Sequence, residues 1–320
     1  MCGILGLAER PAHTASKYGA ELPAMPPGGQ APGAGSFHRS GDDRLWLFAR
    51  AWEPADKTKV RATLMILHGT VDHSGVYGEL AERLVEKGVA VFAMDMRGWG
   101  LSDGEPLYFH DVEVFASDVF DYYNRIHGEG SPYAAVKSRF LCGKSLGGLI
   151  AAWAATSEPE KWTGLVGLSG AFQVADGVRP NPALKGILHV LGWLAPKRPI
   201  KPAFDPALIV SDAGAFKAWE QDPLVSRGKV TVGYILEALR AIDELPARLQ
   251  GFRLPVLMLW GTGDRVVSEG GHEMMYKASS DERSRFIKYD GGFHNLLAEP
   301  SLKEKVIADI DGWIATISGA

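Results

Sequence analysis

The chain has 320 residues, of which 46% are hydrophobic and 22% charged, an ordinary composition for a globular protein. The net charge of −4 gives no reason to expect a nucleic-acid partner, and no apolar run reaches the roughly 18 residues of a membrane span. Cys142 lies in an apolar run and Cys2 near the start, so we expect no disulfide and a cytoplasmic protein.

The first part of the chain, residues 1–36, is expected to form a flexible tail. Its second half, 22–35, is rich in proline, glycine and alanine and offers too little apolar surface to fold alone. Glu9 and Glu21 interrupt its positive charge, and it contains no apolar core of the signal-peptide kind. A targeting peptide is therefore not favoured.

Strands and helices alternate after residue 36. The pattern predicts strands over 45–52, 62–67, 89–95, 139–142 and 164–169, with helices over 77–85 and around 112–122. Ser74 can cap the first of these helices and Gly88 can end it. Strands at 255–260 and 285–289 and a closing helix over 306–317 follow. This alternation predicts a mostly parallel sheet covered by helices on both faces, built from 37–169 and 246–320.

The alternation breaks between residues 170 and 245, where no strand is expected. Asn181-Pro182 is a good helix start, and a leucine-rich stripe follows it; a second helix spans 235–242. We expect this insertion to form a helical cap over the carboxyl edge of the sheet. The stripe, which includes Leu184, Leu188 and Leu191, either packs on the core or forms a face that contacts lipid or lines an acyl tunnel.

A Gly-x-Ser-x-Gly sequence, residues 143–147, lies between a predicted strand and a predicted helix. This strand–turn–helix context is that of a nucleophile elbow, a strained turn that lifts a serine hydroxyl off the sheet edge. Side chains at Gly143 and Gly147 would clash in such a turn. The pattern predicts Ser145 as a catalytic nucleophile.

An acid and a base follow in the order that α/β-hydrolases use. Asp264 and His294 each come just after a predicted strand, at the edge where open α/β sheets hold their ligands. We therefore expect His294 to take the Ser145 proton and Asp264 to orient the imidazole. Asp290 is the competing acid, but its position favours a turn.

The oxyanion of an acyl-transfer intermediate needs backbone N–H donors. We expect these from Leu146 and from Thr70, where Gly69 lets the chain turn inward after a strand. His68 is interpreted as a structural histidine bonded to nearby backbone. A tentative substrate pocket comprises His68, Gly69, Lys144, Leu184, Leu188 and Leu191. The histidine spacings predict no zinc site, and no motif predicts a nucleotide or other cofactor.

Two segments resemble those of a known group of enzymes. Residues 68–77, HGTVDHSGVY, resemble the H-G-x-x-x-H-S-x-x-Y segment of monoacylglycerol lipases, and residues 95–104, DMRGWGLSDG, are similar to their D-x-R-G-x-G-x-S-x-G loop. The resemblance covers roughly 37–317, and its motifs are specific to the group of monoacylglycerol lipases, lysophospholipases and caffeoylshikimate esterases. It implies an α/β-hydrolase fold with a helical cap.

The resemblance also implies Ser145, Asp264 and His294 as the triad, with Thr70 and Leu146 as the oxyanion hole. The expected reaction is hydrolysis of carboxylic esters through an acyl-enzyme, most of all of monoacylglycerols. Small or aromatic esters of the caffeoyl type and lysophospholipids are alternative substrates, and a non-enzymatic binding module is the alternative of another class. Arg97 is expected to pair locally.

One residue departs from the family pattern: Lys144 stands where His or Glu is usual. The lysine either favours an anionic acyl or head group, or faces solvent or pairs with a nearby carboxylate. Lysines and an arginine near the cap helix are compatible with peripheral contact to an anionic membrane as well as with plain solvation. The oligomeric state is not fixed by the sequence.

Overall fold

The computed structural model describes residues 34–42, 45–175, 177–202 and 205–319. Most of the predicted tail, including Cys2, lies outside these residues. Its last positions, 34–36, are described and open strand β1 (Ala34–Arg39), which the sequence analysis did not anticipate.

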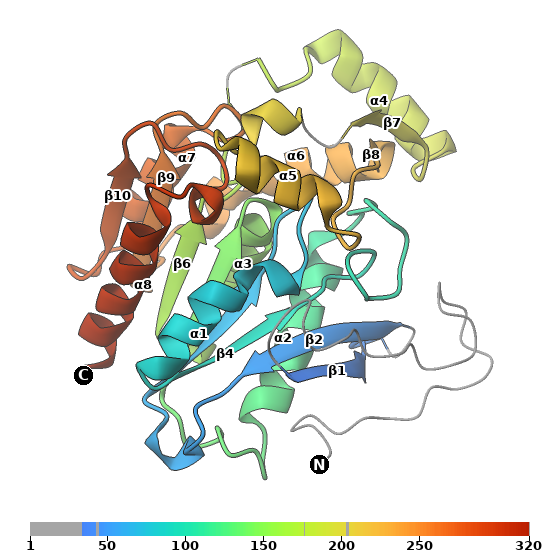
Figure 1. Cartoon of the computed structure of the whole chain (residues 1–320). Coiled ribbons are helices and arrows are strands. Elements are labelled where there is room, and N and C mark those ends of the chain that lie inside the picture. Colours follow the sequence, from blue (N-terminus) through green and yellow to red (C-terminus); the bar gives the residue numbers. More distant parts are fainter. Residues whose placement is uncertain (1–33, 43–44, 176, 203–204, 320) are drawn as a thin grey trace.

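Within the described residues, the main sheet has eight strands in the order β1-β2-β4-β3-β5-β6-β9-β10 (Figure 1). All neighbours from β4 to β10 pair in parallel, whereas β1 and β2 run antiparallel to their neighbours. The predicted, mostly parallel sheet is therefore confirmed. Its remaining strands are β2 (Trp46–Trp52), β3 (Ala62–Leu67), β4 (Val89–Met94), β5 (Ser138–Lys144), β6 (Gly164–Leu168), β9 (Val256–Gly261) and β10 (Arg285–Tyr289).

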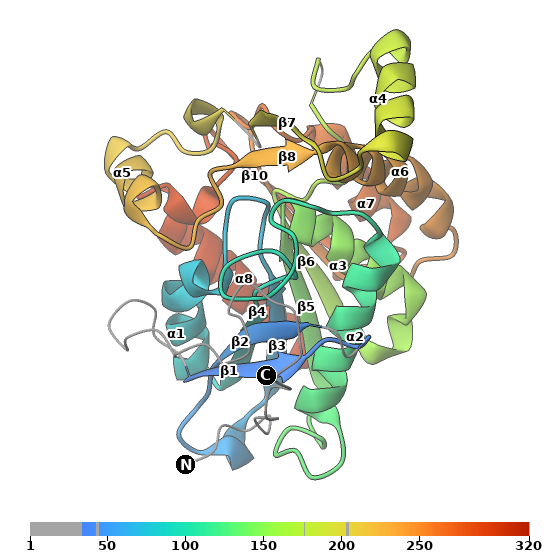
Figure 2. The ribbon, with the colours of Figure 1, turned by 90° about the vertical axis from the view of Figure 1, so that its right-hand side faces the viewer.

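Helices cover both faces of this sheet (Figure 2). Helices α1 (Gly78–Glu86) and α8 (Lys303–Ser318) pack on one face, and α2 (Val112–His127), α3 (Leu146–Ser157) and α7 (Glu269–Ala278) on the other. Successive strand residues point to opposite faces. Leu64 therefore packs in the core beneath α1 and α8, and Met65 packs in the core beneath α2, α3 and α7. None of the described helices is long and apolar enough to cross a membrane.

The segment between β6 and β9, which we call the cap, lies over the carboxyl ends of the parallel strands (Figure 1). It contains α4 (Pro182–Leu194), α5 (Ala213–Gln221) and α6 (Val232–Arg248). Asn181 caps α4 by accepting the N–H of Leu184, as predicted. The expectation of no strand here is wrong, because β7 (Pro199–Pro202) and β8 (Lys229–Thr231) form a short antiparallel pair. Prolines at both ends of β7 weaken its strand signal.

The start of α1 also differs from the prediction. A short 3-10 turn, Ser74–Tyr77, precedes the helix. The side chain that caps this turn is His73, which accepts the Gly75 N–H, and not the predicted Ser74. The Ser74 N–H donates to Asp95 at 2.6 Å. At the other end, Gly88 has φ of +77° and follows the helix as expected.

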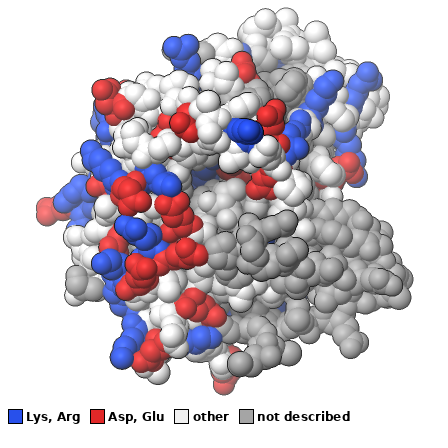
Figure 3. All heavy atoms as spheres, viewed as in Figure 1, with Lys and Arg blue, Asp and Glu red and all other residues white. Residues whose placement is uncertain are grey.

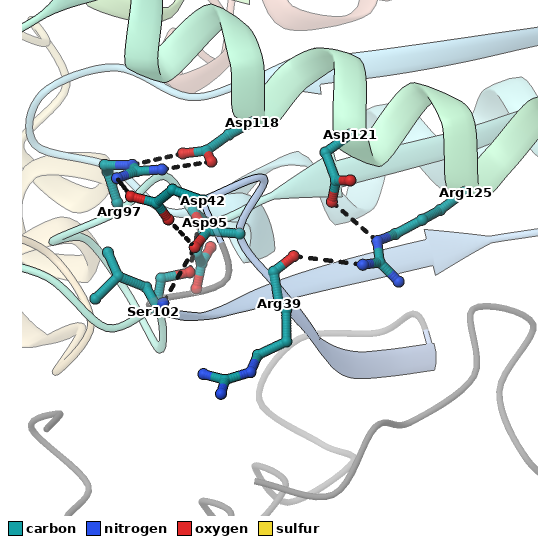
Figure 4. Close-up of polar contacts among 10 residues, drawn as sticks. Arg39, Asp42, Asp95, Arg97, Ser102, Asp118, Asp121 and Arg125 are labelled. Carbon is teal, nitrogen blue, oxygen red and sulfur yellow. Dashed lines mark hydrogen bonds and ion pairs between the residues drawn. The ribbon is translucent and has the colours of Figure 1, made fainter. Parts of the chain in front are cut away.

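Arg97 connects the loop after β4 to α2 (Figure 4). Its guanidinium donates to both carboxylate oxygens of Asp118 at 2.6 Å, and Asp42 lies 3.4 Å away. Arg97 and Asp118 are buried. Since the Arg97 guanidinium pairs with these two carboxylates, the predicted local pairing is confirmed.

Candidate active site

The turn between β5 and α3 holds Ser145 in a strained backbone conformation. Its φ is 51° and its ψ −120°, values that side-chain-bearing residues adopt rarely. A Cβ added at Gly143 would lie 2.2 Å from the Gly147 carbonyl oxygen, and one at Gly147 would lie 2.2 Å from that of Leu67. The clash predicted for both glycine positions is therefore confirmed.

Neighbouring loops hold the Ser145 backbone in place. Its carbonyl accepts N–H groups from Gly148 at 2.9 Å and from Ala171, in the loop after β6, at 2.8 Å. The loop after β3 approaches from the other side, since a Cβ added at Gly69 would lie 3.2 Å from the Ser145 Cβ. The strained serine is thus fixed by the ends of three adjacent strands.

Asp264 and His294, which follow β9 and β10, are hydrogen-bonded to each other. Asp264 Oδ2 lies 2.8 Å from His294 Nδ1, and Asp264 Oδ1 accepts the N–H groups of Val266 at 2.8 Å and Val267 at 3.1 Å. Burial opposes ionisation of Asp264, but the histidine and these donors hold its pKa below the usual value. An ionised Asp264 places the imidazole proton on Nδ1, so Nε2 carries the lone pair.

The competing acid, Asp290, occupies a different environment. It is exposed and accepts the Thr262 hydroxyl at 3.2 Å in the turn after β10. The structure thus joins His294 to Asp264 and places Asp290 in a turn.

Two backbone N–H groups remain available beside Ser145. Among the described residues, neither the Thr70 nor the Leu146 N–H donates to a protein acceptor. The Thr70 carbonyl accepts the Trp99 indole N–H at 2.5 Å, which fixes the peptide from the core side. These are the donors that the sequence analysis assigned to an oxyanion hole.

His68 holds the loop after β3, which carries Thr70, in place. One ring nitrogen bonds the Gly69 carbonyl at 2.7 Å, and the other accepts the Met96 N–H at 3.0 Å. Burial lowers the pKa of the imidazole, so it stays neutral. The ring therefore ties two loops together, which is the structural role predicted for it.

A cavity of about 100 Å³ opens at Ser145 between the elbow and the cap. Its walls are largely apolar, and cap helix α6 forms one side. Among the described residues, its lining includes none of those predicted for the pocket, namely His68, Gly69, Lys144, Leu184, Leu188 and Leu191. Leu188 is buried elsewhere and Leu184 is exposed. The sequence predicts a helix over 235–242, within α6, but not its place in the pocket wall. The wall residues include Leu146, Leu149, Val174, Ile235, Leu239, Ile242, Val266 and Val267.

Lys144, the departure from the family pattern, forms a buried ion pair. Its ammonium lies 2.7 Å from Asp72 Oδ2, and both side chains are 2% exposed. Burial opposes ionisation of Asp72, but Lys144 holds the pKa of this carboxyl below its usual value. Of the two interpretations of Lys144, pairing with a carboxylate is the one that the structure shows. The pair borders a second hollow, of about 210 Å³, next to Trp219 and Asn295.

Lys144→Met is expected to lower the free energy of unfolding by about 3–5 kcal/mol at neutral pH, because it leaves the Asp72 carboxylate buried without a partner. The double variant Lys144→Met/Asp72→Leu should recover much of this loss. In the single variant, burial raises the pKa of Asp72 without the opposing effect of Lys144, and only the weaker influence of His68 and His73 still lowers it. Protonation of Asp72 then favours the folded state, so the deficit should shrink as the pH falls. Urea unfolding at pH 8 and pH 5 measures both effects; an equal deficit at both would contradict the account.

A histidine–carboxylate hydrogen bond links the cap to the same loop. His73 Nε2 donates to Asp222, at the end of α5, at 2.9 Å, while His73 Nδ1 accepts the Gly75 N–H at 3.1 Å. Both ring nitrogens are therefore occupied, and the cap is tied to the core beside the hollow.

One group of carboxylates among the described residues is close enough together to hold a metal ion: Asp111, Glu113 and Glu237. Glu237 already accepts the Val112 N–H at 2.8 Å. Arg240 donates to Glu237 at 2.7 Å and to Glu113 at 2.8 Å. Because Arg240 already pairs with two of these carboxylates and Glu237 accepts a backbone N–H of α2, the cluster fastens α6 to the start of α2.

Comparisons with known proteins identify the family of this chain. The family model described as serine aminopeptidase, S33, matches residues 58–301. Human monoglyceride lipase is 29% identical over 282 residues, which cover 87% of this chain and 89% of that protein. Caffeoylshikimate esterase of Arabidopsis thaliana is 30% identical over 276 residues, covering 84% and 81%.

Solved structures show the same fold. The structure of a soluble variant of monoglyceride lipase from Saccharomyces cerevisiae, in complex with a substrate analogue, superposes with a TM-score of 0.76 at 18% identity, covering 88% of this chain and 94% of that one. The predicted α/β-hydrolase fold and the family resemblance are thus confirmed. The chain belongs to the serine aminopeptidase S33 family of α/β-hydrolases, in its monoacylglycerol lipase-like group of carboxylic ester hydrolases.

Proposed function

We propose that the chain hydrolyses monoacylglycerols through an acyl-enzyme on Ser145. The observation that carries this proposal is the apolar cavity at Ser145, whose aliphatic walls suit a single acyl chain. The identity to monoglyceride lipases over most of both chains supports the same substrate class.

The proposed reaction uses the residues of the site in two half-reactions. His294 Nε2 takes the Ser145 proton as Oγ attacks the ester carbonyl, and Asp264 stabilises the imidazolium. The N–H groups of Thr70 and Leu146 stabilise the oxyanion, where loss of one donor typically costs about 3 kcal/mol. The alcohol leaves with the proton from His294, and a water then releases the fatty acid by the same steps.

A panel of esters tests the substrate class. We expect 1-monoacylglycerols with medium and long chains to be cleaved with higher kcat/KM than p-nitrophenyl acetate, caffeoyl esters or lysophosphatidylcholine. Turnover confined to short and aromatic esters would contradict the monoacylglycerol proposal and favour a small-molecule esterase. Preference for the lysophospholipid would favour a lysophospholipase.

We further propose that the enzyme meets its substrate at a lipid surface through α4. Five of the eight large apolar side chains that are exposed among the described residues lie on this helix. Trp193 is 84% and Ile187 56% exposed. Lys197 and Arg198, just after the helix, are exposed too. The tip of the cap, at the upper right in Figure 3, is largely uncharged with basic side chains beside it. This combination suits an anionic membrane surface.

The double variant Ile187→Glu/Trp193→Glu should bind vesicles of phosphatidylcholine and phosphatidylglycerol at least 100-fold more weakly than the wild type. Burying each side chain contributes about 1.5–3 kcal/mol, and this is lost. Tyr276→Glu, at an exposed aromatic position on α7, is the matched control. Co-sedimentation measures binding, and hydrolysis of a soluble butyrate ester should stay unchanged. Wild-type binding by the double variant would refute a role for α4.

A further inference from the structure

Tyr234, on cap helix α6, reaches across to the loop that carries Thr70. Its hydroxyl lies 2.5 Å from the Thr70 hydroxyl. The ring of Tyr234 forms part of the cavity wall at Ser145. Burial raises the pKa of the phenol to about 12, so it stays protonated throughout the neutral range. Either hydroxyl can donate, and the contact holds the Thr70 side chain in both cases.

Thr70 is therefore held from two directions. From the core, the Trp99 indole binds its carbonyl at 2.5 Å, and His68 and the Asp72 N–H bind the preceding Gly69 carbonyl at 2.7 and 3.2 Å. From the cap, Tyr234 binds its side chain. The core contacts fix the carbonyl oxygens on either side of the Thr70 N–H, and the tyrosine fixes the side chain of the same residue.

The position of this N–H decides how well an oxyanion is stabilised. Donors act best at 2.7–3.1 Å from the oxyanion and when already aligned before reaction. A residue held on one side only can shift by a fraction of an ångström, and misplacement of about 1 Å can cost 100-fold in rate. Removing the Tyr234 hydroxyl leaves the Thr70 hydroxyl without this partner and free to turn, so the peptide loses its restraint from the cap.

We infer that Tyr234 is a positioning residue for the oxyanion hole: through the Thr70 hydroxyl, the cap sets the orientation of the Thr70 N–H. The role differs from substrate binding, because the tyrosine acts on the transition state through Thr70. The inference rests on the proposed function in one respect, namely that Ser145 forms an acyl-enzyme.

Tyr234→Phe tests the inference, because it keeps the ring in the cavity wall and removes the hydroxyl alone. With p-nitrophenyl butyrate we expect kcat to fall about 10-fold, the worth of one hydrogen bond of this kind, with KM nearly unchanged. An alkyl trifluoromethyl ketone, which adds to a serine as an oxyanion, should lose affinity by the same factor as kcat/KM. Tyr108→Phe, a tyrosine packed against Gly233 of the same helix, is the matched control.

Variants at Thr70 complete a double-mutant cycle. Thr70→Val should resemble Tyr234→Phe, and Thr70→Ser should keep more activity than Thr70→Val because it retains a hydroxyl. The double variant Tyr234→Phe/Thr70→Val should be no slower than the slower single variant, since both remove one contact.

Three results would overturn the inference. They are wild-type kcat in Tyr234→Phe, a change confined to KM, and effects of the two substitutions that multiply. If the wild type and Ser145→Ala hydrolyse the ester equally, the proposed function falls and this inference falls with it. Ser145-dependent turnover with an unaffected Tyr234→Phe variant overturns the inference alone.

Discussion

Ser145→Ala is expected to lower kcat for every ester by at least about 10⁴-fold, because it removes the only atom proposed to attack the carbonyl. The fold should persist, since alanine has the same backbone requirements at the φ of 51° that Ser145 adopts. Hydrolysis of p-nitrophenyl butyrate and labelling by a fluorophosphonate both measure the loss.

Ser169→Ala is the matched control for this variant. Ser169 is likewise buried and has a positive φ, 45°, at the end of the adjacent strand. We expect this control to retain activity and to be labelled. Labelling of Ser145→Ala at the wild-type rate would show that another residue is the nucleophile.

Asp264→Asn is expected to lower kcat by about 10⁴-fold with little change in KM. The asparagine oxygen can still accept the N–H groups of Val266 and Val267, so the loop should keep its shape. Its amide, however, donates to His294 Nδ1 and moves the imidazole proton to Nε2, where it blocks proton transfer from Ser145. Initial rates over a range of substrate concentrations separate kcat from KM.

The control for this substitution is Asp290→Asn, which alters the exposed turn carboxylate and should leave kcat unchanged. A large loss in Asp290→Asn together with a small one in Asp264→Asn would reverse the assignment of the acid.

The lowered pKa of Asp264 also implies that the stability of the protein depends on pH in acid solution. Its contribution to stability is complete above the ordinary carboxyl range and is lost as the pH falls through its lowered pKa, and Asp264→Asn should remove this component.

The local parts of the site could be predicted because their chemistry lies in short stretches of sequence. The elbow needs glycine at 143 and 147 for steric reasons that act within a single turn, and the structure shows both clashes. Asp264 and His294 each follow an apolar strand, and adjacent parallel strands bring such residues to one edge of the sheet.

The cap was harder to predict, because an apolar stripe does not say which helix faces inward. The stripe of α4 is compatible with packing on the core, contact with lipid or a place in the pocket wall. In the structure Leu184 is exposed, and α6 lines the cavity through Ile235 and Leu239. Tyr234 lies on the same helix, next to Ile235, and nothing in the neighbouring sequence predicts its contact with Thr70. Such contacts depend on how the cap docks on the core.

The environment of Lys144 could likewise not be predicted from the sequence. Its partner, Asp72, lies 72 positions earlier in the chain, and a lysine beside a nucleophile has as much reason to face substrate or solvent. The pairing arises because β3 and β5 are neighbours, so the loop after β3 folds over the elbow.

The most direct test of the central claim is to trap the acyl-enzyme. Wild-type protein is mixed with p-nitrophenyl decanoate, quenched in acid within the first turnover, and analysed by intact-protein and peptide mass spectrometry. We predict a single decanoyl group on Ser145, released on longer incubation. Turnover with no acyl group on the protein, or an acyl group on another residue, would contradict the mechanism.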